Sequence, residues 1–187
     1  MGDGVIAPLS HFIILVGPRG SGKTTLGHAL ARAIDSPVYD TDRMVEERTG
    51  ESVARLWERE GEEGFRAWES RVLEGLRDLP PGVVSTGGGI ILDPGNRKIL
   101  AELGPVFYLR VPIEQLVARL SHAYEKRPRL KAQVPLAEEI RQVSRERDPL
   151  YRLVATHVVE TGGSSIAGTV EEILKRLKTP ASGEIFP

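Results

Sequence analysis

Cysteine is absent from all 187 residues of the chain. Without thiols there can be no disulfide bond, no thiolate metal site and no cysteine nucleophile. Such a composition fits a protein of a reducing compartment. We therefore expect a cytoplasmic location.

Long apolar runs and an excess of charge of one sign are also missing. The longest apolar run is a short stretch that ends at Val16, which excludes a membrane-spanning helix. Twenty-five basic and 26 acidic residues leave a net charge of −1. A chain this close to neutral has no global basic field for nucleic acid or an anionic membrane. The sequence thus predicts neither as a partner.

Length and composition are ordinary for a globular protein, and 187 residues suit one domain with a full-sized core, although two are not excluded. We expect a single domain spanning 1–187, with its core at about 12–178. The two ends, 1–10 and 179–187, are rich in glycine, proline and serine and are predicted to fray.

Short apolar runs alternate with longer stretches of helical periodicity. The expected strands are Phe12–Val16, Pro37–Tyr39, Val83–Ser85, Val106–Leu109 and His157–Val159. They do not alternate between polar and apolar residues, which is typical of strands that are covered on both faces. The expected helices are Thr24–Ala33, Arg43–Arg48, Val53–Glu60, Glu62–Leu79, Pro94–Leu103, Pro112–Leu120, Leu136–Ala155 and Ile166–Leu177. This alternation predicts an α/β fold, a parallel sheet with helices on both faces.

The most specific motif is a complete G-x-x-x-x-G-K-[ST] loop between the first expected strand and helix. It consists of Gly17, Pro18, Arg19, Gly20, Ser21, Gly22, Lys23 and Thr24, and Thr25 follows it. Backbone N–H groups of such a turn point into one concavity, and the helix dipole adds to its attraction for phosphate. Lys23 can reach the outer phosphates and Thr24 can ligate Mg²⁺. The flanking strand and helix disfavour the alternative, a glycine-rich turn with an accidental lysine.

Two aspartates, Asp40 and Asp42, follow the second expected strand. At strand spacing they face the same side, and ligands of open parallel sheets bind beyond the carboxyl ends of strands. We expect Asp40 to help hold Mg²⁺ through water and Asp42 to orient an acceptor hydroxyl. The alternative is an aspartate that caps the helix beginning near Arg43.

The third expected strand lacks the metal-binding aspartate of many phosphate-loop enzymes. It ends at Ser85 and runs instead into Thr86, Gly87, Gly88 and Gly89. Consecutive glycines let a ligand touch backbone N–H groups directly. A merely flexible loop is the alternative, and the apolar residues that follow disfavour it.

Two arginines are candidates for binding an anion. Arg66 lies beside the apolar face of its helix, one turn from Glu69, which can hold its fork toward a carboxylate. A surface ion pair explains that pattern equally well. Arg147 belongs to a charged run before Asp148-Pro149, where an arginine is more often solvated.

A long polar gap, Ser121–Pro135, separates two expected helices and contains two prolines and four basic residues. A loop of this length in a compact domain is usually functional or disordered. We interpret it as a mobile lid, with a solvated loop as the alternative.

Taken together, these pieces resemble the shikimate kinase family, in a type II-like form, from about Phe12 to Leu177. The matching pieces occur in the family's order: Gly17–Thr24, Asp40-Thr41-Asp42, Gly64-Phe65-Arg66, Thr86–Gly89, Arg127-Pro128 and Arg147–Tyr151. The resemblance implies a three-layer P-loop kinase fold of the nucleoside-monophosphate-kinase type. Its sheet has five parallel strands in the order 2-3-1-4-5, flanked by helices, with a mobile lid.

The resemblance also implies the reaction and the residues that perform it. ATP, with Mg²⁺, would phosphorylate the 3-hydroxyl of shikimate, in a protein expected to be a monomer. Asp42, Lys23 and Arg127 match the family's catalytic positions. Arg66 and Arg147 match those that grip the shikimate carboxylate, and Gly87, Gly88 and Gly89 those that line its site. Arg127 would reach the transferring phosphate, and Arg119 would lie beside adenine.

The chain departs from the family at two places. Arg129-Leu130 follows Arg127-Pro128 where the family often has two leucines. Val159–Ser164 replaces a stretch that often carries Asp-Thr and an arginine near adenine. Three rivals stay open: a kinase for gluconate, a kinase for a nucleoside monophosphate, and a ligand-sensing domain without turnover. The glycine triplet together with Arg147–Tyr151 favours shikimate.

Overall fold

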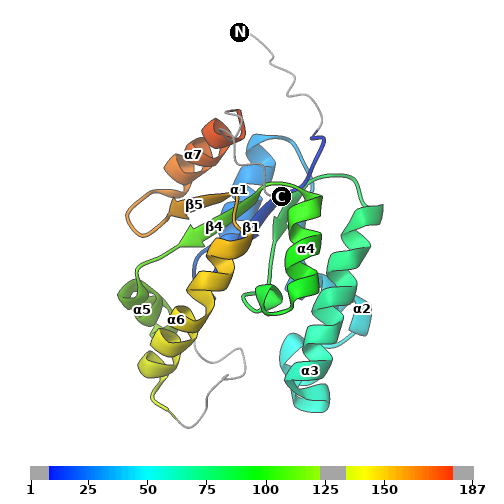
Figure 1. Cartoon of the computed structure of the whole chain (residues 1–187), viewed down its shortest axis with the longest axis vertical. Coiled ribbons are helices and arrows are strands. Elements are labelled where there is room, and N and C mark those ends of the chain that lie inside the picture. Colours follow the sequence, from blue (N-terminus) through cyan, green and yellow to red (C-terminus); the bar gives the residue numbers. More distant parts are fainter. Residues whose placement is uncertain (1–8, 123–133, 179–187) are drawn as a thin grey trace.

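The computed structural model describes residues 9–122 and 134–178. Its centre is a parallel sheet of five strands in the order β2-β3-β1-β4-β5 (Figure 1). The strands are β1 (Ile13–Val16), β2 (Val38–Asp40), β3 (Val83–Ser85), β4 (Val106–Arg110) and β5 (His157–Glu160). Each end lies within one residue of the prediction. In β1, β3 and most of β4 the apolar run that marks the strand is also fully buried. The predicted fold class is confirmed.

Helices cover both faces of the sheet. They are α1 (Lys23–Ala33), α2 (Thr41–Thr49), α3 (Val53–Glu74), α4 (Pro94–Leu103), α5 (Ile113–His122), α6 (Leu136–Val154) and α7 (Ile166–Lys178), with 3-10 turns η1 (Gly75–Asp78) and η2 (Ile90–Leu92). On one face α1 and α7 pack on Ile13 and Leu15 of β1. On the other face α4, α6 and the end of α3 pack on Ile14 and Val16. The alternation along β1 thus supplies two cores, and three layers result.

The long helix α3 bends at Gly61, where φ is 72° and ψ is −171°. This backbone conformation is essentially restricted to glycine. The sequence predicted two helices here, ending at Glu60 and resuming at Glu62, and the break falls at the predicted residue. The bend directs the second segment, which carries Arg66, along the edge of the site.

Several boundaries differ from the prediction. Helix α2 begins at Thr41 instead of near Arg43, so Asp42 is a helical residue, and the strand-spacing argument for Asp40 and Asp42 was wrong. Helix α6 continues through Pro149 and ends at Val154, one residue before the predicted end at Ala155. There the neighbouring Tyr151 is buried and packs in the core with Val154.

The predicted lid and ends lie mostly outside the described residues. Ser121 and His122, placed in the lid by the sequence, belong to α5, and Pro135 caps α6. The segment 123–133, and with it Arg127, lies outside the described residues, as do 1–8 and 179–187. Leu9, expected to fray, packs against the core beneath α1 and α7.

Candidate active site

The phosphate loop connects β1 to α1 and requires its glycines. Gly17, Gly20 and Gly22 have φ of 151°, 80° and 92°, a region that side chains disfavour. A Cβ on Gly17 would also lie 2.8 Å from the carbonyl oxygen of Leu109. Gly22 ends the loop as the N-cap of α1, and a Cβ there would meet nothing within 4 Å. The N-terminus of α1 is therefore open to an anion.

Lys23 lies inside this loop and is only 8% exposed. Its Nζ donates to the carbonyl oxygens of Gly17 and Pro18 at 2.8 and 2.9 Å, and it lies 3.4 Å from Ser21 Oγ. The loop thus holds the ammonium group of Lys23 beside the predicted phosphate site, in a position from which it could contact phosphate oxygens.

Thr24 and Asp40, the two residues predicted to serve Mg²⁺, are in contact. Thr24 Oγ1 donates to Asp40 Oδ2 at 2.9 Å, and Ser85 Oγ lies 3.4 Å from the same hydroxyl. Asp40 Oδ1 accepts from the backbone N–H groups of Asp42 and Arg43 at 3.1 and 3.3 Å, which makes Asp40 the N-cap of α2. The capping alternative is correct for this residue, and the cap leaves Oδ2 facing Thr24.

This donor set fits magnesium. A hydroxyl and a carboxylate are hard oxygen ligands, and Mg²⁺ in phosphoryl-transfer sites commonly takes one or two protein oxygens, with waters and phosphates as the rest. The fixed Asp40 carboxylate and the Thr24 hydroxyl are suited to that arrangement at the edge of the phosphate loop.

Two hollows meet beyond the carboxyl ends of the strands. One surrounds the phosphate loop and is lined by Arg19, Gly20, Gly22, Lys23, Thr24, Thr25, Asp40, Asp42, Thr86 and Gly88. The other lies between α3 and α6 and includes Arg66, Glu69, Gly89, Arg147 and Tyr151. Arg19, Asp42 and Gly88 line both hollows. Asp42 therefore lies where a ligand of one hollow would face a ligand of the other.

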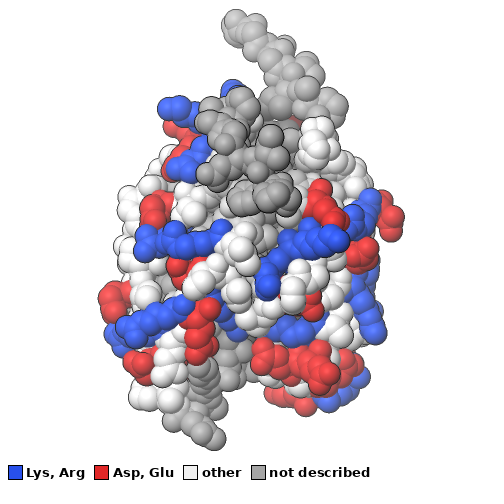
Figure 2. Space-filling view, viewed as in Figure 1, with Lys and Arg blue, Asp and Glu red and all other residues white. Residues whose placement is uncertain are grey.

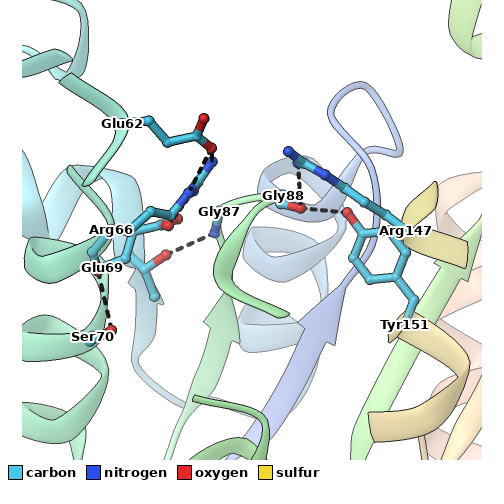
Figure 3. Close-up of polar contacts among 9 residues, drawn as sticks. Glu62, Arg66, Glu69, Ser70, Gly87, Gly88, Arg147 and Tyr151 are labelled. Atoms are coloured by element: carbon cyan, nitrogen blue, oxygen red, sulfur yellow. Dashed lines mark hydrogen bonds and ion pairs between the residues drawn. The ribbon is translucent and has the colours of Figure 1, made fainter. Parts of the chain in front are cut away.

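Arg66 is fixed by two carboxylates of its own helix (Figure 3). Its Nη1 forms an ion pair with Glu69, and Glu62 Oε1 accepts from its Nε at 3.3 Å and its Nη2 at 3.1 Å. The ring centroids of Trp57 and Phe65 lie 5.5 and 5.3 Å from the guanidinium carbon, within cation–π range. Burial opposes the charge, but the carboxylates outweigh it and raise the pKa of Arg66.

Glu69 is fully buried beneath that guanidinium. Burial, reinforced by the nearby Asp42 charge and opposed by Arg66 and Arg147, raises its pKa to about 7. Its Oε1 has no hydrogen-bond partner among the described residues. A carboxylate held this way keeps Arg66 in place without access to bulk water.

Two glycines of the triplet, Gly87 and Gly89, are packed too closely for a side chain. A Cβ on Gly89 would overlap the Arg66 guanidinium, and one on Gly87 would overlap the Glu69 carboxylate and lie 2.7 Å from Asp42 Oδ1. Gly87 donates its N–H to Thr41 Oγ1 at 2.8 Å, so this amide is not available to a ligand. The sequence predicted that the N–H groups of all three glycines could contact a ligand, and for Gly87 this was wrong. No described residue accepts from the N–H groups of Gly88 and Gly89.

Arg147 approaches the same turn from α6, opposite Arg66 (Figure 3). Its Nη1 donates to the carbonyl oxygen of Gly88 at 3.1 Å, and the Tyr151 hydroxyl donates to the same oxygen at 2.6 Å. Arg147 is therefore held at the pocket instead of solvated. Two arginines from two helices, on either side of backbone N–H groups, form a site suited to a carboxylate.

The remaining predicted residue on a described helix is Arg119. Its Nη1 donates to the carbonyl oxygen of Gly20 at 3.0 Å, and Gln115 Oε1 lies 3.5 Å from its Nη2. It therefore borders the phosphate loop on the side of α5.

Sequence reasoning missed three residues of this site: Glu62, Thr41 and Tyr151. Glu62 carries the simplest signal, because it stands four residues before Arg66, the spacing of a helical ion pair. Thr41 and Tyr151 lie within two of the matched motifs, but nothing local in the sequence indicates their contacts with the glycine turn, which is 46 and 63 residues away.

Comparison with known proteins identifies close relatives. A family model described as shikimate kinase matches residues 19–178. A shikimate kinase of Nitrosococcus oceani is 43% identical over 94% of this chain and 91% of its own length. The solved structure of a shikimate kinase from Acinetobacter baumannii, in complex with shikimate, is 38% identical and has a TM-score of 0.81; it covers 89% of this chain and 92% of that one.

A gluconokinase from Sinorhizobium meliloti resembles this chain in fold alone. Its solved structure is 20% identical, with a TM-score of 0.57 over 89% of this chain and 93% of that one.

Proposed function

Because this chain belongs to the shikimate kinase family, we propose that it transfers the γ-phosphoryl group of ATP to the 3-hydroxyl of shikimate. The observation that carries this proposal is the position of Asp42 at the junction of the two hollows. A nucleotide in the first hollow would direct its terminal phosphate toward a hydroxyl in the second.

The acceptor half binds the carboxylate end of shikimate. The forks of Arg66 and Arg147, with the N–H groups of Gly88 and Gly89, receive the carboxylate, which fixes the ring at that end. A hydroxyl at the far side of the ring then lies near Asp42, which orients it and accepts its proton. Arg66 enters this complex with its fork already held by Glu62 and Glu69, so little side-chain entropy is lost on binding.

The donor half stabilises charge on the phosphates. Lys23 and the N–H groups of the loop face the phosphate oxygens, and Thr24 with Asp40 would hold Mg²⁺, which supplies further charge neutralisation. Arg127 would reach the transferring phosphate, although it lies outside the described residues. Arg119, beside the phosphate loop, would flank the adenine.

We further propose that the protein works in the cytoplasm as a monomer, without nucleic acid or membrane as partner. Acidic and basic side chains are interspersed on the face in Figure 2, in keeping with a net charge of −1. None of the helices within residues 9–122 and 134–178 is long and apolar enough to cross a membrane.

A coupled assay of ADP release tests the proposal, with ATP and Mg²⁺ and shikimate, gluconate or AMP in parallel. We expect turnover with shikimate and at most background rates with the other two. Preferred phosphorylation of gluconate or AMP would assign the chain to another kinase of this fold. Saturable binding of shikimate without ADP release would indicate a sensing domain.

A further inference from the structure

A single buried hydroxyl joins the glycine turn to the aspartate motif. Thr41 Oγ1 accepts the Gly87 N–H at 2.8 Å, and Thr41 is completely buried. A buried backbone N–H needs a hydrogen-bond acceptor, because without one the folded state bears the full free-energy cost of removing that N–H from water. This hydrogen bond therefore holds the turn at its first glycine.

Thr41 lies between the two aspartates of the proposed site. It is the first residue of α2, directly after Asp40 at the end of β2 and directly before Asp42. Asp40 contacts Thr24 in the donor half, and Asp42 borders the acceptor hollow. The Thr41 hydroxyl thus connects the segment that carries both aspartates to the turn that lines the acceptor hollow.

The position of Gly87 in turn sets the spacing of the acceptor half. Its α-carbon packs against the carboxylates of Glu69 and Asp42, so closely that a Cβ does not fit. Glu69 holds Arg66, and the next residue of the turn, Gly88, accepts from Arg147. A shift of the turn would therefore alter the distance between Asp42 and the two arginines together.

We propose that Thr41 is a positioning residue for the reaction: its hydroxyl fixes the separation between Asp42 and the carboxylate-binding arginines, so that shikimate fits between them. The inference rests on the proposed function and goes beyond it, because Thr41 lines neither hollow. It acts through Gly87 instead of through the substrate.

Three variants separate the hydroxyl from the rest of the side chain. Thr41→Val keeps the branched shape and removes the hydroxyl, Thr41→Ala removes both, and Thr41→Ser keeps the hydroxyl. We expect Val and Ala to raise KM for shikimate roughly tenfold, since a buried N–H loses its partner. KM for ATP should stay within about twofold in these variants, because Asp40 contacts Thr24 through its own side chain and the Thr41–Gly87 hydrogen bond does not involve the phosphate loop. The Ser variant should have a KM for shikimate close to that of the wild type.

The Ala variant keeps the test decisive if the Val variant does not fold. Equal loss in Ser, Val and Ala would overturn the inference, as would an unchanged KM for shikimate in the variants without the hydroxyl. A parallel rise in both KM values would show a structural role only. Wild-type turnover of shikimate is measured in the same series. If the wild type does not phosphorylate shikimate, the proposed function is refuted. If it does and Thr41→Val leaves KM for shikimate unchanged, only the role of Thr41 is refuted.

Discussion

Arg66 illustrates how much of the site depends on the shape of one side chain. Its planar fork contacts Glu62 and Glu69 and overlies two aromatic rings. We expect Arg66→Lys, which keeps the charge and loses the fork, to raise KM for shikimate by tenfold or more and to leave KM for ATP nearly unchanged. Steady-state kinetics with each substrate varied in turn measure both. A fall in ATP affinity would instead assign Arg66 to the nucleotide site.

Asp42 has a different proposed role, because it borders both hollows and would orient the reacting hydroxyl of the acceptor. Removing its charge in Asp42→Asn should lower kcat by about 10²–10⁴-fold, the usual contribution of a general base. Circular dichroism checks that the variant folds. We expect it to fold, because the backbone N–H that Asp42 donates to the Asp40 cap is retained in Asn. A decrease of less than about threefold would exclude this role.

Glu69 should make stability depend on pH. Its pKa is 4.5 as a free side chain and about 7 in the folded protein. Between those values the folded state holds a proton that the unfolded state has lost, so the free energy of unfolding falls as pH rises from 4.5 to 7. Glu69→Gln has no such titration. Relative to that variant, the wild type should lose on the order of 2–3 kcal/mol between pH 5 and 8.

Urea unfolding of the wild type and Glu69→Gln at several pH values tests this prediction. Titrating groups that do not interact with Glu69 contribute equally to both proteins and cancel in the difference. Parallel curves of unfolding free energy against pH would contradict the buried, proton-retaining carboxylate.

Among the elements, α3 depends on its bend. Gly61 adopts φ 72° and ψ −171°, a conformation that costs a residue with a side chain about 1–3 kcal/mol. A Cβ at this position would meet no atom within 4 Å, so backbone strain is isolated from steric overlap. Gly61→Ala should therefore lower the free energy of unfolding by that amount, and it should also raise KM for shikimate, because the bend aims Arg66.

Gly163→Ala is the matched control for this experiment. A Cβ at Gly163 also meets nothing within 4 Å, and its φ lies outside the region that favours glycine. It should be neutral or slightly stabilising in chemical denaturation. Equal effects at the two glycines would mean that the bend carries no strain.

The elements also show why sequence reasoning succeeds where it does. Strands such as Val83–Ser85 and the break at Gly61 were predictable, because an apolar run and a lone glycine between two helical patterns are local signals. The start of α2 was misplaced, because Asp40 resembles either the end of a strand or a cap. In the structure it is both, the last residue of β2 and the N-cap of α2.

At the scale of the whole molecule, the order of the strands determines which residues meet. β1, with the phosphate loop at its end, lies between β3, which leads into the glycine turn, and β4; β2, which leads into Asp40 and Asp42, is on the far side of β3. The contacts of Thr41 with Gly87 and of Tyr151 with Gly88 follow from this order. They were not predictable from the local sequence, since their partners are 46 and 63 residues apart.

The same arrangement separates the two proposed substrates. In the proposed function, backbone N–H groups and Lys23 of the donor half would bind phosphate, whereas Arg66 and Arg147 of the acceptor half would bind a carboxylate. Among residues 9–122 and 134–178, only Arg19, Asp42 and Gly88 line both halves. Recognition of the acceptor should therefore depend on its carboxylate, independently of ATP.

Comparison of shikimate with its methyl ester in the ADP-release assay tests this central claim most directly. Each charge-assisted hydrogen bond contributes about 1.5–3 kcal/mol, so loss of the carboxylate charge from two arginines should lower kcat/KM at least about 100-fold, with KM for ATP unchanged. Equal kcat/KM for the acid and the ester would contradict the account, because Arg66 and Arg147 would then not bind the carboxylate.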